Sequence, residues 1–371
     1  MTSRRNLLLS GGAVVVAGTA GALALGRDMG SLDAYRSAVA STRAALQRRP
    51  EIREILRYAT LAPSGHNTQP WMFRVSGPRI EIHPDTARRT PVVDPDDHHL
   101  FVSLGCAAET LALASAAAGR PGDLSFAPAG PGVVVFESGP GAATASPLFG
   151  AIPRRQSTRG DYDGRPVSAD ELRALAAAAT MPDVDLILVT DRSGMGRLRD
   201  LVIDGNSVQM ADPAFLRELR SWMRFNPRDA LHTGDGLFSA TTGNPILPGW
   251  LGPGVFDLAF KAPSENARYA RQIASSAGLA VFVGHEAGPQ NWVSGGRAAQ
   301  RFGLQATALG LKTAFINQPV EVAALRPALA DLVGMKGRRP DLMMRFGRGS
   351  DLPYAARRPV RDVLAGGLAD V

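Results

Sequence analysis

Hydrophobic and polar positions along the chain follow patterns that predict an ordered set of helices and strands after residue 30. Ser31 suits the N-cap of the first helix, and Pro50 ends the helical pattern because proline lacks a backbone N–H. Ile80 and Ile82 alternate with polar neighbours, as in a hairpin strand. The pattern predicts helices over 32–47 and 51–60 and strands over 71–75 and 79–83.

The same order of elements recurs later in the chain. Residues 101–119 align with residues 292–310 at a constant offset, and eight of the 19 aligned positions are identical. Helical segments that end at Pro63 and at Pro182 are each followed by a strand, the second over 184–189. Alanine-rich helices inflate such identities, but the two agreements together predict two related halves, over 32–138 and 151–365.

The acidic stretch before residue 100 has two interpretations. Carboxylates next to His98 and His99 suggest a metal site, but adjacent histidines leave a helix on different sides, unlike a pair at i and i+4. Asp94 as N-cap and Pro95 at the first helical position favour the start of a helix that runs to Gly119. We therefore expect a helix start here and no metal site.

Composition narrows the class of protein. With 45% hydrophobic and 20% charged residues, the chain can bury a large core. The net charge of +7 comes almost entirely from scattered arginines, since only three of the 41 basic residues are lysines. Basic residues interleaved with aromatic ones, as a strand-binding groove requires, are absent from the sequence, so we expect no nucleic-acid partner. The lone cysteine, Cys106, excludes an internal disulfide.

The first 26 residues are predicted to be a targeting segment rather than part of the fold. Arg4 and Arg5 precede an uncharged run over 6–26 that is rich in Ala, Val, Gly and Leu. The paired arginines resemble a twin-arginine signal, which implies export. The alternative is a membrane anchor, because the run is close to the roughly 20 residues that a span needs. In either case we expect the segment to be the only contact with a membrane.

A polar loop between the second helix and the first strand concentrates small hydrogen-bonding groups. It reads Ala-Pro-Ser-Gly-His-Asn-Thr-Gln-Pro-Trp over 62–71, and its prolines stiffen both ends. An ordinary capped turn explains this composition equally well. The pattern, however, resembles the signature loop of the nitroreductase superfamily, whose members bind FMN. The resemblance implies that Ser64, Gly65, Asn67 and Gln69 contact the flavin, and His66 is the one histidine expected beside the site.

Further matches to the same superfamily lie in the second half. Arginine forks match phosphate oxygens, and Arg-x-Ser-x-Arg over 155–159 resembles the superfamily's phosphate-binding motif. A predicted buried strand over 341–347 is followed by a basic segment, and 315–318 occupies the place of the segment near flavin N5. The resemblance implies FMN-binding roles for Arg155, Gln156, Ser157, Arg159, Asn317, Gln318, Arg357 and Arg358.

The order of these motifs differs from that of ordinary nitroreductases. There the phosphate motif precedes the signature loop in one chain, and two subunits build each site. Here the loop lies in the first half, the phosphate motif lies in the second, and neither is doubled. The arrangement resembles the Acg-type branch and implies an α+β fold of mainly antiparallel sheets flanked by helices. Two fused halves would imitate a nitroreductase dimer, in a monomer with one flavin site.

Residues 224–263 form a Gly- and Pro-rich stretch with interspersed aromatic residues. A structureless loop of this length in a compact domain is unusual and is often functional. The resemblance to the Acg-type branch implies a lid over the flavin. The alternative is a peripheral excursion that only covers the scaffold.

The resulting hypothesis is an FMN-dependent oxidoreductase that transfers a hydride from NAD(P)H or another reductant to a small nitroaromatic or quinone-like acceptor. No protein acid, base or metal is expected to be required. The first alternative is a flavin-sequestering protein that does not turn over. The second is a degenerate scaffold without flavin.

Overall fold

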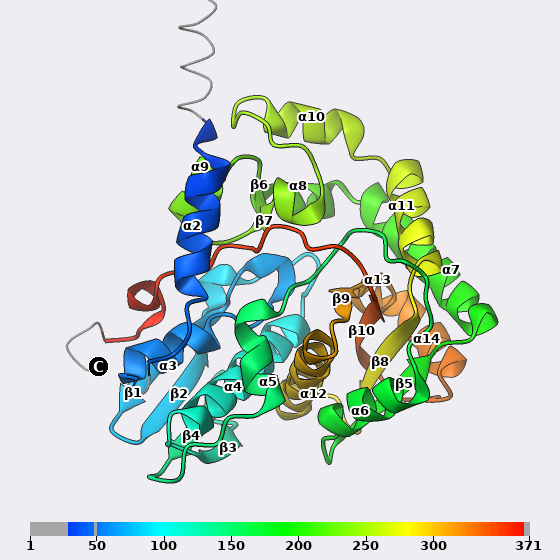
Figure 1. Ribbon diagram of the computed structural model, residues 1–371. Helices are drawn as coiled ribbons and strands as arrows, with labels where there is room; N and C mark the ends of the chain where they lie inside the picture. Colours follow the sequence, from blue (N-terminus) through cyan, green and yellow to red (C-terminus); the bar gives the residue numbers. More distant parts are fainter. Residues whose placement is uncertain (1–28, 48–49, 367–371) are drawn as a thin grey trace, which may run out of the picture.

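The computed structural model describes residues 29–47 and 50–366. The predicted targeting segment over 1–26 lies outside these residues. The described chain is α+β, as predicted, and its main sheets are two four-stranded antiparallel sheets with helices between and around them (Figure 1). A two-stranded parallel sheet completes the strand pairing.

The two large sheets have the same topology. In each, the strands lie in the order first, second, fourth, third along their part of the chain, and every neighbouring pair is antiparallel. The first sheet contains β1 (Trp71–Ser76), β2 (Arg79–Pro84), β4 (Val133–Ser138) and β3 (Gly122–Ala127). The second contains β5 (Val184–Val189), β8 (Gly278–Gly284), β10 (Pro340–Gly347) and β9 (Lys312–Phe315).

Helices precede and interrupt the two sheets at matching points. A helix precedes the first strand of each sheet, and a 20-residue helix connects its second and third strands. The leading helices are α3 (Ile52–Ala59) and α6 (Ala169–Ala179), and the connecting helices are α4 (His98–Ala117) and α12 (Pro289–Ala308). By length and composition α4 could cross a membrane, but most of it is buried in the protein core.

The helices α4 and α12 pack against each other through glycine. A Cβ on Gly105 would lie 2.1 Å from the carbonyl oxygen of Val293, and one on Gly296 would lie 2.0 Å from that of Val102. In the sequence alignment of the two helices, Gly105 corresponds to Gly296 and Val102 corresponds to Val293, so the two contacts are equivalent. The backbones therefore approach so closely that only glycine fits at either crossing point.

The largest difference between the two sheets is an insertion. A two-residue turn joins β1 to β2, whereas some 90 residues join β5 to β8 (Figure 1). The insertion contains α7 (Arg192–Ala211), α8 (Pro213–Ser221), β6 (Met223–Arg224), α9 (Pro227–Thr233), β7 (Leu237–Phe238), η4 (Ser239–Thr242), α10 (Gly252–Ala259) and α11 (Ala262–Ala274).

Short elements and the C-terminal segment complete the fold. After β10 the chain returns to the first sheet, where Ala365 N donates to Phe73 O (Figure 1). The remaining elements are α2 (Leu32–Thr42), η1 (Gly65–Asn67), η2 (Thr86–Arg88), α5 (Pro147–Ala151), η3 (Ile152–Arg154), α13 (Gln318–Glu321), η5 (Ala323–Leu325), α14 (Arg326–Leu332) and η6 (Val360–Val363).

Two predicted helix boundaries were wrong. The first helix ends at Thr42 rather than continuing to residue 47. The helix that was expected to begin after Asp94 begins at His98, and the Asp94 carboxylate instead accepts from the backbone N–H groups of His99 and Leu100. Asp94 thus still accepts hydrogen bonds from the backbone N–H groups at the start of α4, although it precedes the helix by about one turn.

Candidate functional site

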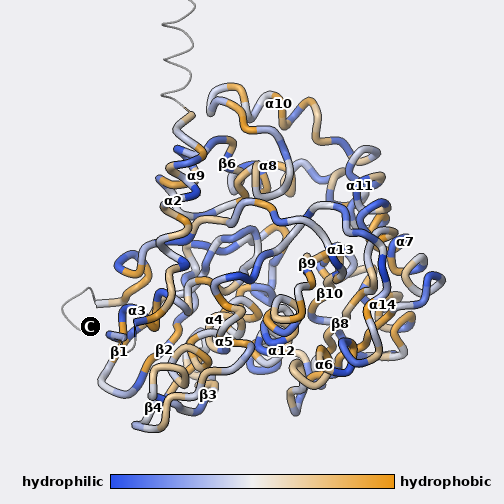
Figure 2. The backbone as a smooth tube through the Cα atoms, viewed as in Figure 1, coloured by the Kyte–Doolittle hydropathy of each residue, from blue (hydrophilic) through white to orange (hydrophobic). Residues whose placement is uncertain are grey.

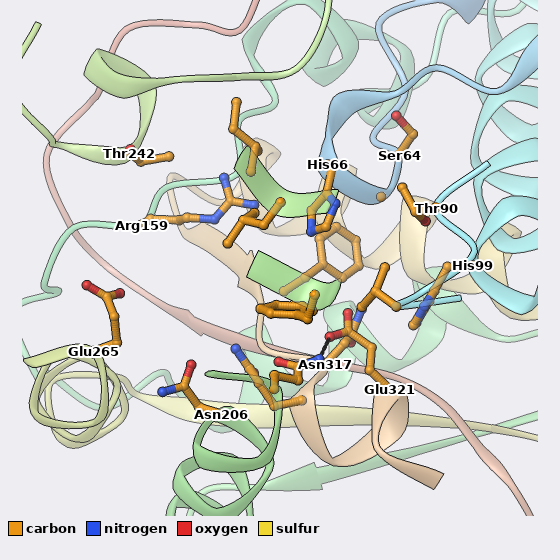
Figure 3. A pocket seen from close by; sticks show the side chains of 18 of the residues that line it. Ser64, His66, Thr90, His99, Arg159, Asn206, Thr242, Glu265, Asn317 and Glu321 are labelled. Carbon is orange, nitrogen blue, oxygen red and sulfur yellow. Dashed lines mark hydrogen bonds between the residues drawn. The ribbon is translucent and has the colours of Figure 1, made fainter. Parts of the chain in front are cut away.

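A cavity lies where the signature loop, the start of α4, the insertion and the segment after β9 meet. Its volume is about 230 Å³, and an adjoining cavity of about 60 Å³ shares Ser64, Arg159 and Phe315 with it. Figure 3 shows Ser64, His66 and Arg159 on one side of the larger cavity and Asn206, Asn317 and Glu321 on the opposite side. Both halves of the chain therefore contribute to one continuous space.

The signature loop has an unusual backbone. His66, Asn67 and Gln69 have φ values of 45°, 56° and 53°, in the left-handed region that residues other than glycine rarely adopt. The Asn67 amide donates to Gly236 O at 3.1 Å, and the Gln69 amide donates to Gly234 O at 2.9 Å. The insertion thus holds the loop in its strained shape.

The acceptor atoms of the same two side chains are also used within the protein. Asn67 Oδ1 accepts from Arg357, and Gln69 Oε1 accepts from the backbone N of Arg358. Gln69 is fully buried, and neither Gln69 nor Arg358 is among the described residues that line the two cavities. Asn67 and Gln69 therefore fix the loop. Asn67 also lines the smaller cavity, and other residues of the loop line the larger one.

The larger cavity is lined by three further residues of the signature loop, Ser64, Gly65 and His66. A Cβ on Gly65 would meet nothing within 4 Å, so open space lies beside this backbone. His66 Nδ1 is buried without a hydrogen-bond partner in the described chain. Burial, with the nearby Arg159 charge, lowers the pKa of His66 to about 4, so its imidazole is neutral at neutral pH. The prediction that His66 lies beside the site agrees with this position.

Four arginines line the smaller cavity: Arg43, Arg155, Arg159 and Arg357. Within the described residues, none of them forms an ion pair with a carboxylate. Burial and the neighbouring guanidinium of Arg155 lower the pKa of Arg43 to about 9, and burial lowers that of Arg155 to about 10. Uncompensated buried charges of one sign are costly, so this cavity is suited to an anion.

The four arginines differ in how many donors they have left. Arg357 donates to the carbonyl oxygens of Thr60, Leu61 and Ala62 at the end of α3, as well as to Asn67. The hydrogen-bond donors of its guanidinium are therefore already used within the protein. Arg155, Arg159 and Arg43 are the members of the cluster with free capacity. The Nε atoms of Arg155 and Arg43 are buried without partners in the described chain, and Arg159 makes no side-chain hydrogen bond within it.

The basic turn that carries Arg155 and Arg159 is held from inside the protein. Arg345 of β10 is fully buried and donates to the carbonyl oxygens of Thr158 and Gly160 at 3.0 and 2.7 Å. The Gln156 amide is likewise directed at the framework, where it donates to Leu352 O. Ser157 forms an isolated parallel β-bridge with Thr313 of β9 and lines the smaller cavity. Arg43 and Arg345 were not anticipated from the sequence. Arg43 lies outside the motifs, and Arg345 lies in the predicted strand over 341–347, where nothing marked its side chain as a support of the basic turn.

The opposite wall is built after β9, where Asn317 and Gln318 were predicted. Asn317 Oδ1 accepts from Met343 N at 2.9 Å, and Gln318 Oε1 is buried without a partner in the described chain. Glu321, one helical turn later, also lines the cavity and accepts from Gln209 Nε2 at 2.6 Å. Burial raises the pKa of Glu321 to about 7. Sequence reasoning missed this carboxyl because only its spacing from the predicted segment pointed to it.

The start of α4 brings together three possible metal ligands, although the sequence led us to expect no metal site. Side-chain atoms of Asp94, His98 and His99 lie within 4.8 Å of one another. His98 Nε2 is hydrogen-bonded to Asp341 Oδ1 at 3.1 Å. Burial, together with nearby arginines, lowers the pKa of His98 to about 3, so its imidazole is neutral, which is the form that binds metals. The positive helix terminus and the positive arginines, in contrast, disfavour a cation here.

The stretch 224–263 is more ordered than predicted, because it contains α9, β7, η4 and α10. Phe256 of α10 and Phe260, which directly follows this helix, line the larger cavity, with their rings stacked at a centroid distance of 4.6 Å. Thr242 and Asn244 contribute polar groups to the same wall. The insertion is thus one wall of the cavity as well as the support of the signature loop.

Comparison with known proteins agrees with these features. A model of the nitroreductase family matches residues 152–348, just over half of the sequence. The chain belongs to the nitroreductase family. This match contains the basic turn, the insertion and the whole second sheet, and it begins after the signature loop.

Relatives of this nitroreductase-family chain include a Mycobacterium tuberculosis protein, Rv3131, that is provisionally named as an NAD(P)H nitroreductase. It is 29% identical over 342 residues, which cover 84% of this chain and 90% of that protein. Among solved structures, a nitroreductase with bound FMN from Desulfitobacterium hafniense is 16% identical, covers 57% of this chain and 95% of its own, and has a TM-score of 0.38. The FMN-dependent nitroreductase NfnB of Mycobacterium smegmatis, solved with NADPH, is 14% identical, covers 55% and 88%, and has a TM-score of 0.36.

Proposed function

We propose that the protein is an FMN-dependent oxidoreductase whose flavin lies in the larger cavity with its phosphate in the smaller one. The observation that carries this proposal is the buried arginine cluster, which has spare donors and no carboxylate partner within the described chain. Planar guanidinium groups bind phosphate oxygens in pairs, and an anion would relieve their mutual repulsion. Family membership supports the same assignment.

Residues with unused polar atoms would hold the cofactor. Arg155, Arg159, Arg43 and the Ser157 hydroxyl would bind the phosphate, and the open backbone at Gly65 would allow close approach of the ring. Ser64, His66, Asn317 and Gln318 face the larger cavity, where they could bind the polar edge of a flat ring. Asn67, Gln69, Gln156, Arg357 and Arg358 would support the site by fixing the backbone around it.

Bound FMN would supply two-electron hydride transfer from NAD(P)H or another reductant to a nitroaromatic or quinone-like acceptor. The chain would supply binding, exclusion of water and a proton. Glu321 retains its carboxyl proton up to about pH 7, and Gln209 orients that carboxyl at the cavity wall. Phe256 and Phe260 would exclude water on the opposite side.

We also propose that the two halves arose by duplication, so that one chain imitates a nitroreductase dimer of the Acg-type branch. The identical strand order of the two sheets supports this, and so do the matched glycine contacts between α4 and α12. Two side-chain hydrogen bonds between α4 and α12 are equivalent as well: Arg301 donates to Glu109, and Gln300 donates to Thr110. The alignment of the two helices matches Glu109 with Gln300 and Thr110 with Arg301. Contacts related in this way are expected at a two-fold interface.

The experiment is to record the visible spectrum of the purified protein and to titrate it with FMN. We expect a yellow protein, or a colourless one that binds added FMN, and rapid anaerobic bleaching by NADH or NADPH. A protein that takes up no FMN would refute the proposal. Binding of phosphate without binding of FMN would show that the site binds anions but not flavin.

The alternative of flavin storage is favoured by one observation, the aromatic wall formed by α10. If Phe256 and Phe260 seal the cavity, FMN would bind but would not be bleached by either nicotinamide cofactor. The same anaerobic experiment separates the two functions. Bleaching within seconds identifies an enzyme, and a stable yellow colour over hours identifies storage.

A further inference from the structure

The outer face of α10 and of the two residues before it carries large hydrophobic side chains that the core does not use. Trp250 is 70% exposed and Leu258 is 78% exposed, and the neighbouring Leu251 is also exposed. Figure 2 shows hydrophobic residues on and before α10, although this helix lies at the edge of the molecule. An exposed aromatic and aliphatic cluster of this kind marks a surface that binds something.

The charge on this surface is already neutralised. Between residues 245 and 260 the sequence has one charged side chain, Asp257, and Arg220 pairs with it at 2.6 Å. The inner face of the helix is occupied, because Phe256 and Phe260 line the cavity. Trp250, Leu251 and Leu258 therefore remain as an outward apolar surface, here named the α10 face.

The described chain begins at the same corner of the molecule. A Cβ on Gly30 would lie 3.0 Å from Arg228 N, and one on Gly249 would lie 3.2 Å from the adjacent Asp229. Trp250 thus follows a residue that packs on the start of α9, where the fold also receives the chain from the N-terminal side (Figure 1). The uncharged run over 6–26, which the sequence predicts to be an export signal or, alternatively, a membrane anchor, precedes this point in the chain.

We propose that the α10 face docks onto the surface of a lipid bilayer, which adds a second contact to the single one that the sequence led us to expect through the N-terminal segment. Tryptophan is suited to the membrane interface because its ring is apolar and its N–H is polar, and leucine side chains can enter the acyl region. The α10 face itself carries no unpaired charge, and the net charge of +7, spread over the whole chain, adds only a general attraction to anionic lipids. Because α10 is also a wall of the cavity, docking places the cavity beside the bilayer.

A fluorescent probe on the full-length protein tests this proposal. Leu258→Cys, labelled with an environment-sensitive dye, reports contact at the α10 face, and Arg173→Cys on α6 is the matched exposed control. Native Cys106 is buried, and burial raises the pKa of its thiol to about 12, so it should not be labelled. Vesicles of phosphatidylglycerol and phosphatidylcholine, with and without a membrane-bound quencher, supply the bilayer.

We expect vesicles to shift the emission at position 258 to shorter wavelength and to make it quenchable from the bilayer, with no change at position 173. Trp250→Ser should weaken vesicle binding several-fold, whereas Leu332→Ser, at an exposed leucine on α14, should not. Sedimentation with vesicles without a change at 258 would show that only the N-terminal segment binds, and would overturn the proposal. A vesicle-independent change at 258 that rises with protein concentration would identify a second copy of the chain as the partner instead.

Discussion

Arg159 is the arginine of the cluster whose side chain makes no hydrogen bond or ion pair in the described part of the chain. It lines both cavities and lies beside His66 (Figure 3). Burial lowers its pKa, with a further contribution from Arg268, so the charge is destabilising until an anion arrives. The position of Arg159 is therefore better explained by ligand binding than by a contribution to the stability of the fold.

We therefore predict that Arg159→Met weakens FMN binding by about 10- to 100-fold, the loss of one charged hydrogen-bonding group. Because the substitution removes a half-buried charge that has no partner in the described chain, the melting temperature of the flavin-free protein should not fall. Flavin fluorescence titration and thermal denaturation measure the two effects. The control is Arg154→Met at the exposed neighbouring position, which should change neither. Unchanged affinity in Arg159→Met would remove Arg159 from the site.

Glu321 should make the reaction depend on pH. With a pKa raised to about 7, its carboxyl is protonated below neutrality and loses its proton as the pH rises through 7. We predict that the rate with a nitroaromatic acceptor declines above pH 7 in the wild type, and that Glu321→Gln removes this decline while flavin content is retained. A variant with the wild-type profile would show that the proton comes from elsewhere.

The same carboxyl should affect stability with a defined sign. The folded pKa lies above the ordinary value of 4.5, so the folded state binds more protons between pH 4.5 and 7. The contribution of Glu321 to stability therefore decreases as the pH rises through that window. Between pH 4.5 and 7, the melting temperature of Glu321→Gln minus that of the flavin-free wild type should therefore increase with pH. For the exposed control Glu286→Gln this difference should stay constant.

At the scale of elements, the cavity depends on the insertion between β5 and β8. Part of it holds the signature loop through Gly234 and Gly236, and part of it covers the cavity through α10. Removing the whole stretch would therefore disrupt the loop together with the cover. Substitutions confined to α10 separate the two roles.

We predict that Phe256→Ala combined with Phe260→Ala speeds the reduction of bound FMN by an external reductant several-fold, because it opens the cavity wall. Stopped-flow absorbance under anaerobic conditions measures this rate. Leu258→Ala, on the outward side of the same helix, is the control and should leave the rate unchanged. An unchanged rate in the double variant would contradict the role of α10 as a lid.

The crossing of α4 and α12 is the second element on which the fold depends. A Cβ at Gly296 would overlap the Val102 carbonyl oxygen, so Gly296→Ala must push the helices apart. We predict a loss of about 1–3 kcal/mol in the free energy of unfolding, measured by urea denaturation. Gly150→Ala in α5, where a Cβ would meet nothing within 4 Å, should be neutral or slightly stabilising. Equal stability of both variants would show that the helix pair adjusts freely.

At the scale of the whole molecule, the two related sheets and the paired central helices place both parts of the proposed site in one chain. The loop comes from the first half, and the basic turn comes from the second. No second subunit is then needed to complete the site. We predict a monomer with one FMN per chain, which light scattering coupled to size-exclusion chromatography and the flavin-to-protein absorbance ratio would measure. A dimer in solution, or two flavins per chain, would contradict this prediction.

Much of the local structure followed from the sequence. The four strands that the pattern predicted agree with the structure to within a residue or two, because alternation and turn residues are short-range signals, and the strand over 184–189 agrees fully. The strands β3, β4 and β8 were not predicted. Likewise, the capping role of Ser31 was confirmed, since its side chain accepts from Ala34 N. Helix ends were predicted less well, because tertiary contacts decide where a helix stops.

The sequence by itself determined the residue types at the site, namely the signature loop, the basic turn and their order along the chain. Only the tertiary structure decided which side chains face the cavity. Asn67 and Gln69 belong to the loop pattern, yet their amides are used to hold a left-handed backbone. Arg43 and Glu321 lie outside the motifs, yet line the cavities. The reason is physical: spacing along a chain records local geometry, whereas burial, pKa and free hydrogen-bonding capacity depend on which distant segments pack around each group.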